Sequence, residues 1–134
     1  MQFSNALARE IWDAKYRFSP TDGRPGDTTV DDMIERVSRA VAEAEVPALR
    51  KKWSARFAKA LTDFRFIPGG RILAGAGTER RVTLFNCFVM GTIPDSLDGI
   101  FAHLGEAART MQQGGGVGMD FSTIRPKGSY VVGV

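Results

Sequence analysis

The sequence predicts an α+β chain, in which a helical amino-terminal half is followed by a half that glycines interrupt. Apolar residues recur at helical spacing up to about residue 65, where the only glycines are Gly23 and Gly26 of the chain's 15. The run 82–90 is rich in branched and aromatic residues and is typical of a buried strand. With 134 residues, 43% hydrophobic and 25% charged, the composition excludes disordered and collagen-like chains.

Three helices are expected in the first half. Asn5 can cap a helix that runs to about Phe18, Thr28 or Thr29 can cap a second, and Pro47 opens a third. The third helix carries an apolar stripe that we interpret as core and not as a cofactor site. The apolar positions of the three helices are Leu7, Ile11, Trp12 and Tyr16, then Val30, Met33, Ile34, Val37, Val41 and Ala44, then Leu49, Trp53, Phe57, Ala60, Leu61 and Phe64.

Glycines and prolines shape the second half. From Phe66 onward they prevent a continuous helix and indicate backbone that another group approaches closely. Asp95 or Ser96 can cap a further helix, which Gly114 ends. The glycines at 114, 115, 116 and 118 can present bare amide groups to an anion or a sugar, or they can form a plain helix-ending turn. They follow a helix and lack the spacing of the dinucleotide and phosphate-loop fingerprints.

The formal charge of +3 is too small to form a nucleic-acid stripe unless it is clustered, and no nucleic-acid partner is predicted. The nearest cluster is a solvated helix face or, alternatively, a phosphate track. It consists of Arg50, Lys51, Lys52, Arg56 and Lys59. No apolar stretch is long enough to span a membrane and no secretory signal begins the sequence, so a cytoplasmic location is expected.

Cys87 is the only cysteine, so neither an internal disulfide nor a cysteine-rich zinc site can form, and no metal site is predicted. On its residues alone, Cys87 is a small buried hydrophobe, because nothing in the sequence links it to His103 or another base. Asp95 can serve as a structural cap or accept a hydrogen bond from a ribose hydroxyl. Arg125 and Lys127 fit a phosphate clamp or a surface turn.

Several strings of residues carry a family resemblance. They are Phe66-Ile67-Pro68-Gly69-Gly70-Arg71-Ile72-Leu73-Ala74-Gly75-Ala76-Gly77-Thr78, Asn86-Cys87-Phe88-Val89, Asp95-Ser96-Leu97-Asp98-Gly99-Ile100, Gln113-Gly114-Gly115-Gly116-Val117-Gly118 and Arg125-Pro126-Lys127-Gly128. In this order and spacing, the sequence resembles the amino-terminal part of the adenosylcobalamin-dependent (class II) ribonucleotide reductase large chain. No ATP-cone-like region precedes them, which favours class II over class I.

The resemblance implies an α+β fragment. Residues 1–65 would form an amino-terminal helical region, and residues 66–134 would begin a ten-stranded α/β barrel that is incomplete here. The implied reaction converts ribonucleotides to deoxyribonucleotides for DNA synthesis by a thiyl-radical mechanism. The implied cofactor is adenosylcobalamin, bound mainly by residues outside this sequence, and a thioredoxin-like donor would reduce the redox cysteines.

The resemblance also implies roles for individual residues. Cys87 matches one of the redox cysteine pair, which reverses the interpretation from its surroundings. Asp95 and Arg125 match contacts to an allosteric deoxynucleoside triphosphate, and the helix 95–113 would form a homodimer contact. The positions near the ribonucleotide substrate would be Ile67, Pro68, Gly69, Gly70, Asn86, Gly115 and Gly116.

Three hypotheses follow. In the first, the sequence is part of a reductase, is inert alone, and has lost its second redox cysteine and radical cysteine to truncation. In the second, it is a stand-alone (deoxy)nucleotide-binding regulatory module without catalysis. In the third, it is a helical interaction module whose basic third helix binds a partner.

Overall fold

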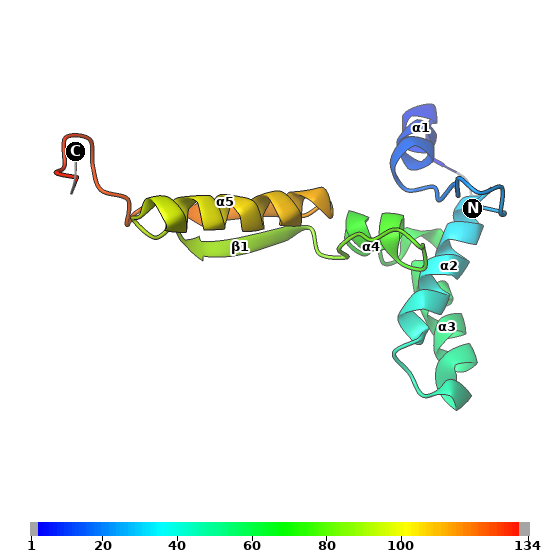
Figure 1. Cartoon of the computed structure of the whole chain (residues 1–134). Helices are drawn as coiled ribbons and strands as arrows, with labels where there is room; N and C mark the ends of the chain where they lie inside the picture. The colour runs from blue at the N-terminus through cyan, green and yellow to red at the C-terminus, as the bar shows by residue number, and fades with distance from the viewer. Residues whose placement is uncertain (1–2, 132–134) are drawn as a thin grey trace. The chain divides into compact units, whose positions relative to one another are not determined.

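A computed structural model describes residues 3–131, and the chain divides into two compact units (Figure 1). Unit 1 spans Met1–Leu84 and unit 2 spans Phe85–Val134. Within residues 3–131, no helix combines the length and apolar character needed to cross a membrane.

Unit 1 is helical, as predicted. Its elements are α1 (Ala6–Lys15), α2 (Val30–Ala42), α3 (Pro47–Leu61), the 3-10 turn η1 (Thr62–Phe64) and α4 (Gly70–Gly75). The predicted caps at Asn5 and Thr29 are confirmed, since their side chains accept hydrogen bonds from the N–H groups of Ala8 and Asp32. Helix α1 ends at Lys15 and not near Phe18, because the Phe18 N–H donates to the Asp27 carboxylate at 2.9 Å and leaves the helical pattern.

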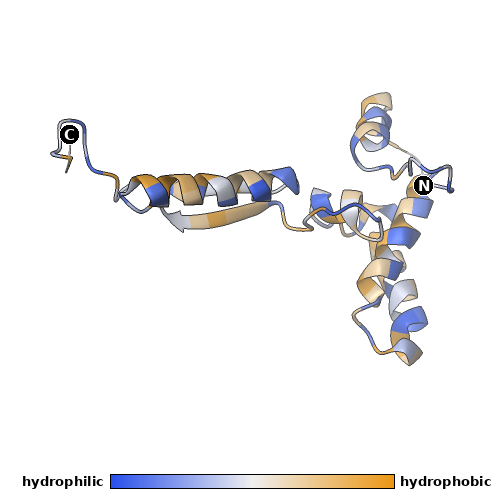
Figure 2. Cartoon of the chain, in the orientation of Figure 1, coloured by the Kyte–Doolittle hydropathy of each residue, from blue (hydrophilic) through white to orange (hydrophobic). Residues whose placement is uncertain are grey.

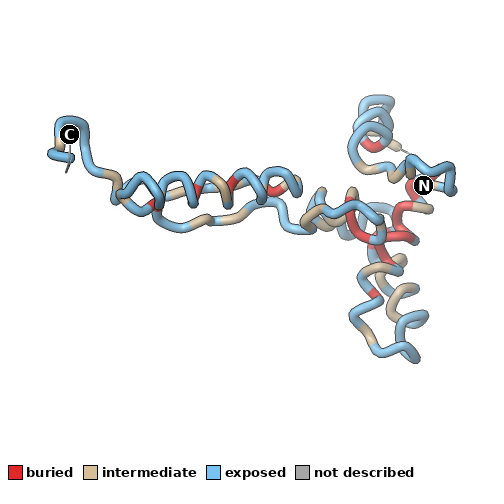
Figure 3. Tube along the Cα trace, in the orientation of Figure 1, coloured by how far each residue is buried: buried red, intermediate tan, exposed pale blue. Residues whose placement is uncertain are grey.

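The core of unit 1 is centred on α2, where buried residues gather (Figure 3). Its buried apolar members are Trp12, Val30, Met33, Ile34, Val37, Leu61 and Ala76. The prediction that the whole apolar stripe of α3 is core is wrong, because Leu49, Ala60 and Phe64 are exposed and only Leu61 is fully buried. Phe64 lies beyond α3, in a turn whose positive φ angles at Asp63 (57°) and Phe64 (54°) redirect the chain.

The division between the units falls after Leu84, whereas the sequence analysis places a boundary after Arg65. The segment in between belongs to unit 1 because α4 returns to the core: Ala76 is buried there, and Ile72 and Leu73 pack against it. Helix α4 also shows that the glycines of this segment permit a short helix.

Unit 2 is a β-α-β unit, with β1 (Cys87–Thr92), α5 (Leu97–Gln112) and β2 (Gly116–Asp120). Strands β1 and β2 pair in parallel, with Cys87 opposite Gly116. Helix α5 contacts β2, and its N-cap is Ser96, whose hydroxyl accepts the Gly99 N–H at 3.1 Å.

The prediction of a buried strand over 82–90 is wrong in both position and environment. Strand β1 starts at Cys87, and side chains along it alternate between exposed and half-buried, with Val89 94% exposed. Two strands form the sheet in the described part of the chain, and apolar side chains of β1 and α5 such as Val89 and Leu97 are exposed. Figure 2 shows the apolar residues along these two elements.

Candidate functional site

The Cys87 thiol lies at the start of β1 and is exposed. Its neighbour Asn86 accepts the Gly116 N–H through its backbone carbonyl at 2.8 Å, and a Cβ built on Gly116 would lie 3.4 Å from the Cys87 Sγ. The structure therefore places Asn86, Cys87 and Gly116 next to one another. The interpretation of Cys87 as a buried hydrophobe is wrong, because the residue is exposed at the start of β1.

The glycine segment after α5 does not offer the free amides that the sequence suggests. The N–H groups of Gly114, Gly115 and Gly116 donate to the carbonyls of Met111, Thr110 and Asn86 at 2.9, 3.0 and 2.8 Å. These backbone donors are already satisfied within the chain, so of the two alternatives the structure supports the helix-ending turn and not bare amides at these three glycines.

Internal packing explains the glycine at 115. A Cβ there would lie 2.7 Å from the Phe88 Cε2 and 2.9 Å from the Thr110 Cγ2, so only glycine lets β1, α5 and this turn approach one another. Gly114 has a φ of 87° and ends α5 as predicted. At Gly116, by contrast, the missing side chain leaves room beside the thiol.

Asp95 and Arg125 contact each other. The Arg125 Nε donates to the Asp95 carboxylate at 2.7 Å, its Nη2 to the Asp95 carbonyl at 3.1 Å and its Nη1 to the Tyr130 carbonyl at 3.1 Å. The Asp95 and Arg125 side chains are 32% and 38% exposed, so a ligand can reach both. The cap role open to Asp95 is wrong, because Ser96 caps α5.

The segment Ile67–Gly70 lies in unit 1 between η1 and α4. Ile67 is 61% exposed, and Pro68 borders two apolar hollows of about 440 and 330 Å³. A Cβ on Gly70 would lie 3.3 Å from the Tyr16 ring, so the segment passes closely over α1 at this point. It is grouped with the helical unit, while Asn86, Cys87, Gly115 and Gly116 belong to unit 2.

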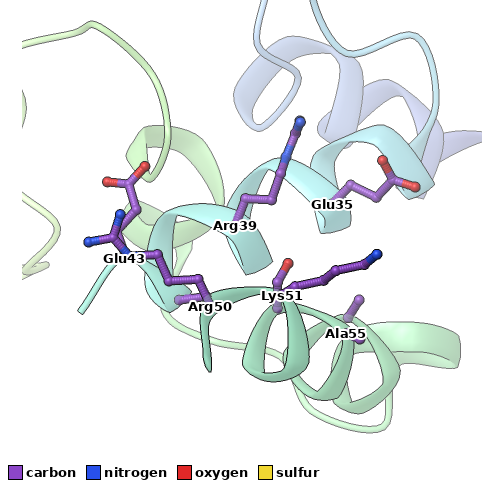
Figure 4. A pocket seen from close by; sticks show the side chains of 9 residues that line it. Glu35, Arg39, Glu43, Arg50, Lys51 and Ala55 are labelled. Carbon is purple, nitrogen blue, oxygen red and sulfur yellow. The ribbon is translucent and has the colours of Figure 1, made fainter. Parts of the chain in front are cut away.

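The basic cluster of α3 is exposed in full, as a solvated face would be. Two of its members, Arg50 and Lys51, join Arg39 of α2 at the rim of a 590 Å³ hollow between the helices. Glu35 of α2 and Glu43, the residue that ends this helix, also line the hollow, so its charge is mixed (Figure 4). None of the residues predicted to bind substrate or effector lines it.

No group of three or more His, Cys, Asp and Glu side chains within residues 3–131 could hold a metal ion. His103 is buried on α5, and its Nε2 has no hydrogen-bond partner among the described residues. At the end of β2, the Ser122 N–H donates to Asp120 at 2.9 Å and lowers the pKa of this carboxyl group.

Asp27 and Arg36 form a buried ion pair at 2.8 Å that the sequence analysis does not single out. The available signal was a charged residue, Arg36, beside Val37 and three positions after Met33 on the apolar face of α2. Such a position predicts a buried charge that needs a partner.

Two family models together cover most of the chain. Residues 2–81 match the model described as ribonucleotide reductase, all-alpha domain, and residues 85–134 match the model described as ribonucleotide reductase, barrel domain. The chain belongs to the ribonucleotide reductase large-subunit family. The two reductase models meet where the structure divides into its two units.

Reductases from distant organisms are similar in sequence to this chain. A vitamin B12-dependent ribonucleoside-diphosphate reductase of Mycobacterium tuberculosis is 39% identical over 120 residues, which cover 87% of this chain and 17% of the relative. The ribonucleoside-diphosphate reductase subunit alpha of Synechocystis is 36% identical over 69% of this chain and 12% of the relative. The ribonucleoside-diphosphate reductase large subunit of vaccinia virus is 36% identical over 54% of this chain and 9% of the relative. The chain thus spans about a sixth of the length of the M. tuberculosis relative.

Proposed function

We propose that this chain supplies one redox thiol and part of the nucleotide sites of a ribonucleotide reductase. The observation that carries the proposal is the exposed Cys87 thiol beside Gly116, in a chain that belongs to the reductase family. In the reaction, a ribonucleotide loses its 2′-hydroxyl as water and gains hydrogen at that carbon. Two thiols supply the two electrons and become a disulfide, which a thioredoxin-like donor would then reduce.

Cys87 is the proposed first member of that thiol pair. Because the sequence holds one cysteine, it cannot form the disulfide within itself, and we expect the 134 residues alone to be catalytically inert. A thiyl radical that removes the 3′-hydrogen would have to form on a different cysteine. The contribution of this chain is therefore to hold one reductant thiol against the sugar, with Asn86 and Gly116 beside it.

Dependence on adenosylcobalamin is proposed from the vitamin B12-dependent relative. When bound, this group supplies the radical that starts the reaction. The described residues do not fit it: they contain no metal-binding cluster, and their one histidine is buried on α5. We therefore place the cobalamin contacts outside these residues and derive no step through them.

Asp95 and Arg125 are proposed to hold a deoxynucleoside triphosphate effector. One oxygen of the Asp95 carboxylate accepts the hydrogen bond from the Arg125 Nε. The second carboxylate oxygen could then accept a hydrogen bond from a ribose hydroxyl. Arg125 has five N–H donors, so phosphate oxygens can share it with its present acceptors. This contact also favours the second candidate function, a nucleotide-binding regulatory module. A homodimer through α5 would cover its exposed residues Leu97, Phe101 and Leu104.

Protection of the thiol tests the main proposal. We expect a ribonucleoside diphosphate to slow alkylation of Cys87 by iodoacetamide, because the sugar would lie against the thiol. Pyrophosphate is the matched control and should leave the rate unchanged, and C87S supplies the blank. An alkylation rate that does not respond to any of the four ribonucleoside diphosphates would count against a substrate site at Cys87.

Calorimetry tests the second candidate function, a nucleotide-binding regulatory module. We expect heat of binding from at least one of the four deoxynucleoside triphosphates, and its loss in D95A. A regulatory module without catalysis predicts this binding together with an alkylation rate that ribonucleotides do not change. Absence of heat from all four, with the protein folded, would remove the effector role of Asp95 and Arg125.

A further inference from the structure

Arg36 is a buried cation whose donors connect three parts of unit 1. Its side chain is 7% exposed and pairs with Asp27, which is itself 4% exposed. Its Nη1 donates to the Ala76 carbonyl at 2.5 Å, and its Nη2 donates to the Leu73 carbonyl at 3.0 Å and to the Tyr16 carbonyl at 3.4 Å. One guanidinium therefore joins α2 to the end of α1 and to the last turn of α4.

Helix α4 depends on such outside contacts. It spans six residues, its N-cap Gly69 offers no side-chain hydrogen bond, and its first turn holds no acidic residue. Isolated helices of this length are unstable, because nucleation costs more than a few hydrogen bonds return. Leu73 and Ala76 carry carbonyls at its carboxyl end, where a cation both supplies donors and matches the helix dipole. Arg36 meets both requirements from within the core.

We propose that Arg36 is a positioning residue for the Ile67–Gly70 segment. This segment runs directly into α4, and the Gly69 carbonyl accepts the first α4 hydrogen bonds, from the N–H groups of Ile72 at 2.9 Å and Leu73 at 3.3 Å. By fixing the carboxyl end of α4, Arg36 sets where Gly69 and Gly70 lie over Tyr16. The consequence for substrate rests on the proposed function, in which Ile67–Gly70 lies near the ribonucleotide.

The planar guanidinium is what the role requires. A lysine at position 36 would keep the charge beside Asp27, but a single ammonium group cannot serve the carboxylate and both α4 carbonyls in this fork geometry. R36K should therefore retain the fold of unit 1 but lose the hydrogen bonds to the Leu73 and Ala76 carbonyls at the end of α4. R39K is the matched control, because Arg39 lies on the same helix and is exposed.

Amide hydrogen exchange measured by NMR on the 134-residue chain tests the inference. In R36K we expect the amides of Leu73 and Ala76 to exchange about tenfold faster, as loss of hydrogen bonds from a charged donor would cause, with α3 amides within about twofold of the parent. R39K should leave all of these rates unchanged. Unchanged rates at α4 in R36K would overturn the proposal. Equal acceleration throughout unit 1 would also overturn it, because Arg36 would then act on the fold as a whole.

Titration of the same samples with a ribonucleoside diphosphate connects the role to substrate. We expect shifts of the Gly69 and Gly70 amide signals in the parent and in R39K, and at least about fivefold weaker binding in R36K. Equal affinity in R36K would exclude an effect of this positioning on substrate. If the parent shows no shift, the proposed substrate role of Ile67–Gly70 fails, while the exchange rates still decide whether Arg36 holds α4.

Discussion

The two units differ in how far they bury their apolar side chains. In unit 1, Val37 is 2% exposed at the centre of a core built from α1, α2, α3 and α4, whereas in unit 2 Val89 is 94% exposed on β1. Helices α2 and α3 can bury apolar faces against each other, but a parallel strand pair needs cover on both faces, and α5 packs on one side. The difference shows that unit 1 holds its own core, while unit 2 presents surface for other contacts.

The ion pairs of the two units differ in the same way. The Asp27 and Arg36 side chains are 5% and 7% exposed, and their charged groups also bond to the Phe18 N–H and the Ala76 carbonyl within unit 1. Asp95 and Arg125 are about a third exposed. Separating a buried ion pair costs much free energy, because it leaves an unpaired charge out of water, so such a pair stabilises one structure. A ligand can separate an exposed pair at a small cost in free energy.

Removal of Asp27 should produce the largest effect. D27A leaves the Arg36 charge buried without its carboxylate and removes the acceptor of the Phe18 N–H, so we expect unit 1 to lose about 3–5 kcal/mol of stability. Urea denaturation followed by the fluorescence of Trp12 and Trp53, which both lie in unit 1, would measure it.

D13A is the control for this prediction. Asp13 pairs with Arg17 at 2.6 Å, but the two side chains are 56% and 39% exposed, so its removal should cost less than about 1 kcal/mol. Similar losses in D27A and D13A would contradict the distinction between a buried and an exposed pair.

An added methyl group at Gly115 should destabilise unit 2. In G115A the new Cβ would lie 2.7 Å from the Phe88 Cε2, which forces β1 or α5 to move, at a cost of about 1–3 kcal/mol. G118A is the matched control, since the nearest atom to its Cβ would be the Phe88 carbonyl oxygen at 4.0 Å. NMR-detected urea unfolding would follow unit 2 separately. A G115A variant as stable as G118A would mean that internal packing does not require this glycine.

Local signals in the sequence predicted local structure well. The caps at Asn5, Thr29 and Ser96 were predictable, because a cap depends on residues within one turn. The exposure of Cys87 was not, because the apolar run around it predicts cover that depends on the rest of the fold. The Asp27–Arg36 pair joins residues nine apart through tertiary packing, and neither residue has a local motif.

Motif strings predicted part of the arrangement around Cys87. They placed Asn86, Cys87 and Gly116 in one site, and the structure brings these three together. The hydrogen bonds of Gly114, Gly115 and Gly116 could not be predicted, because the sequence does not say which carbonyl each amide meets. The resemblance assigned Asp95 and Arg125 to one effector, but the direct hydrogen bond between them could not be predicted, because 30 positions separate them in the sequence.

Acid should affect helices α2 and α5 differently, and this is the smallest effect that we expect. Hydrogen bonds from the Thr28 hydroxyl and from the N–H groups of Thr28 and Thr29 lower the pKa of Asp32 from 3.8 to about 2. Since the folded pKa lies below the unfolded one, this contribution to stability is complete above about pH 3.8 and is lost as the pH falls towards 2. Helix α5 has Gly99 where α2 has Asp32, so its cap lacks this carboxylate.

The α2 cap can be tested through the pH dependence of stability. We expect the thermal midpoint of unit 1 to fall between pH 5 and pH 2.5 by more in the parent than in D32N, because the asparagine does not titrate. If D32N loses as much stability in acid as the parent does, the titration of other carboxylates accounts for the acid sensitivity of unit 1 and the α2 cap contributes none of it.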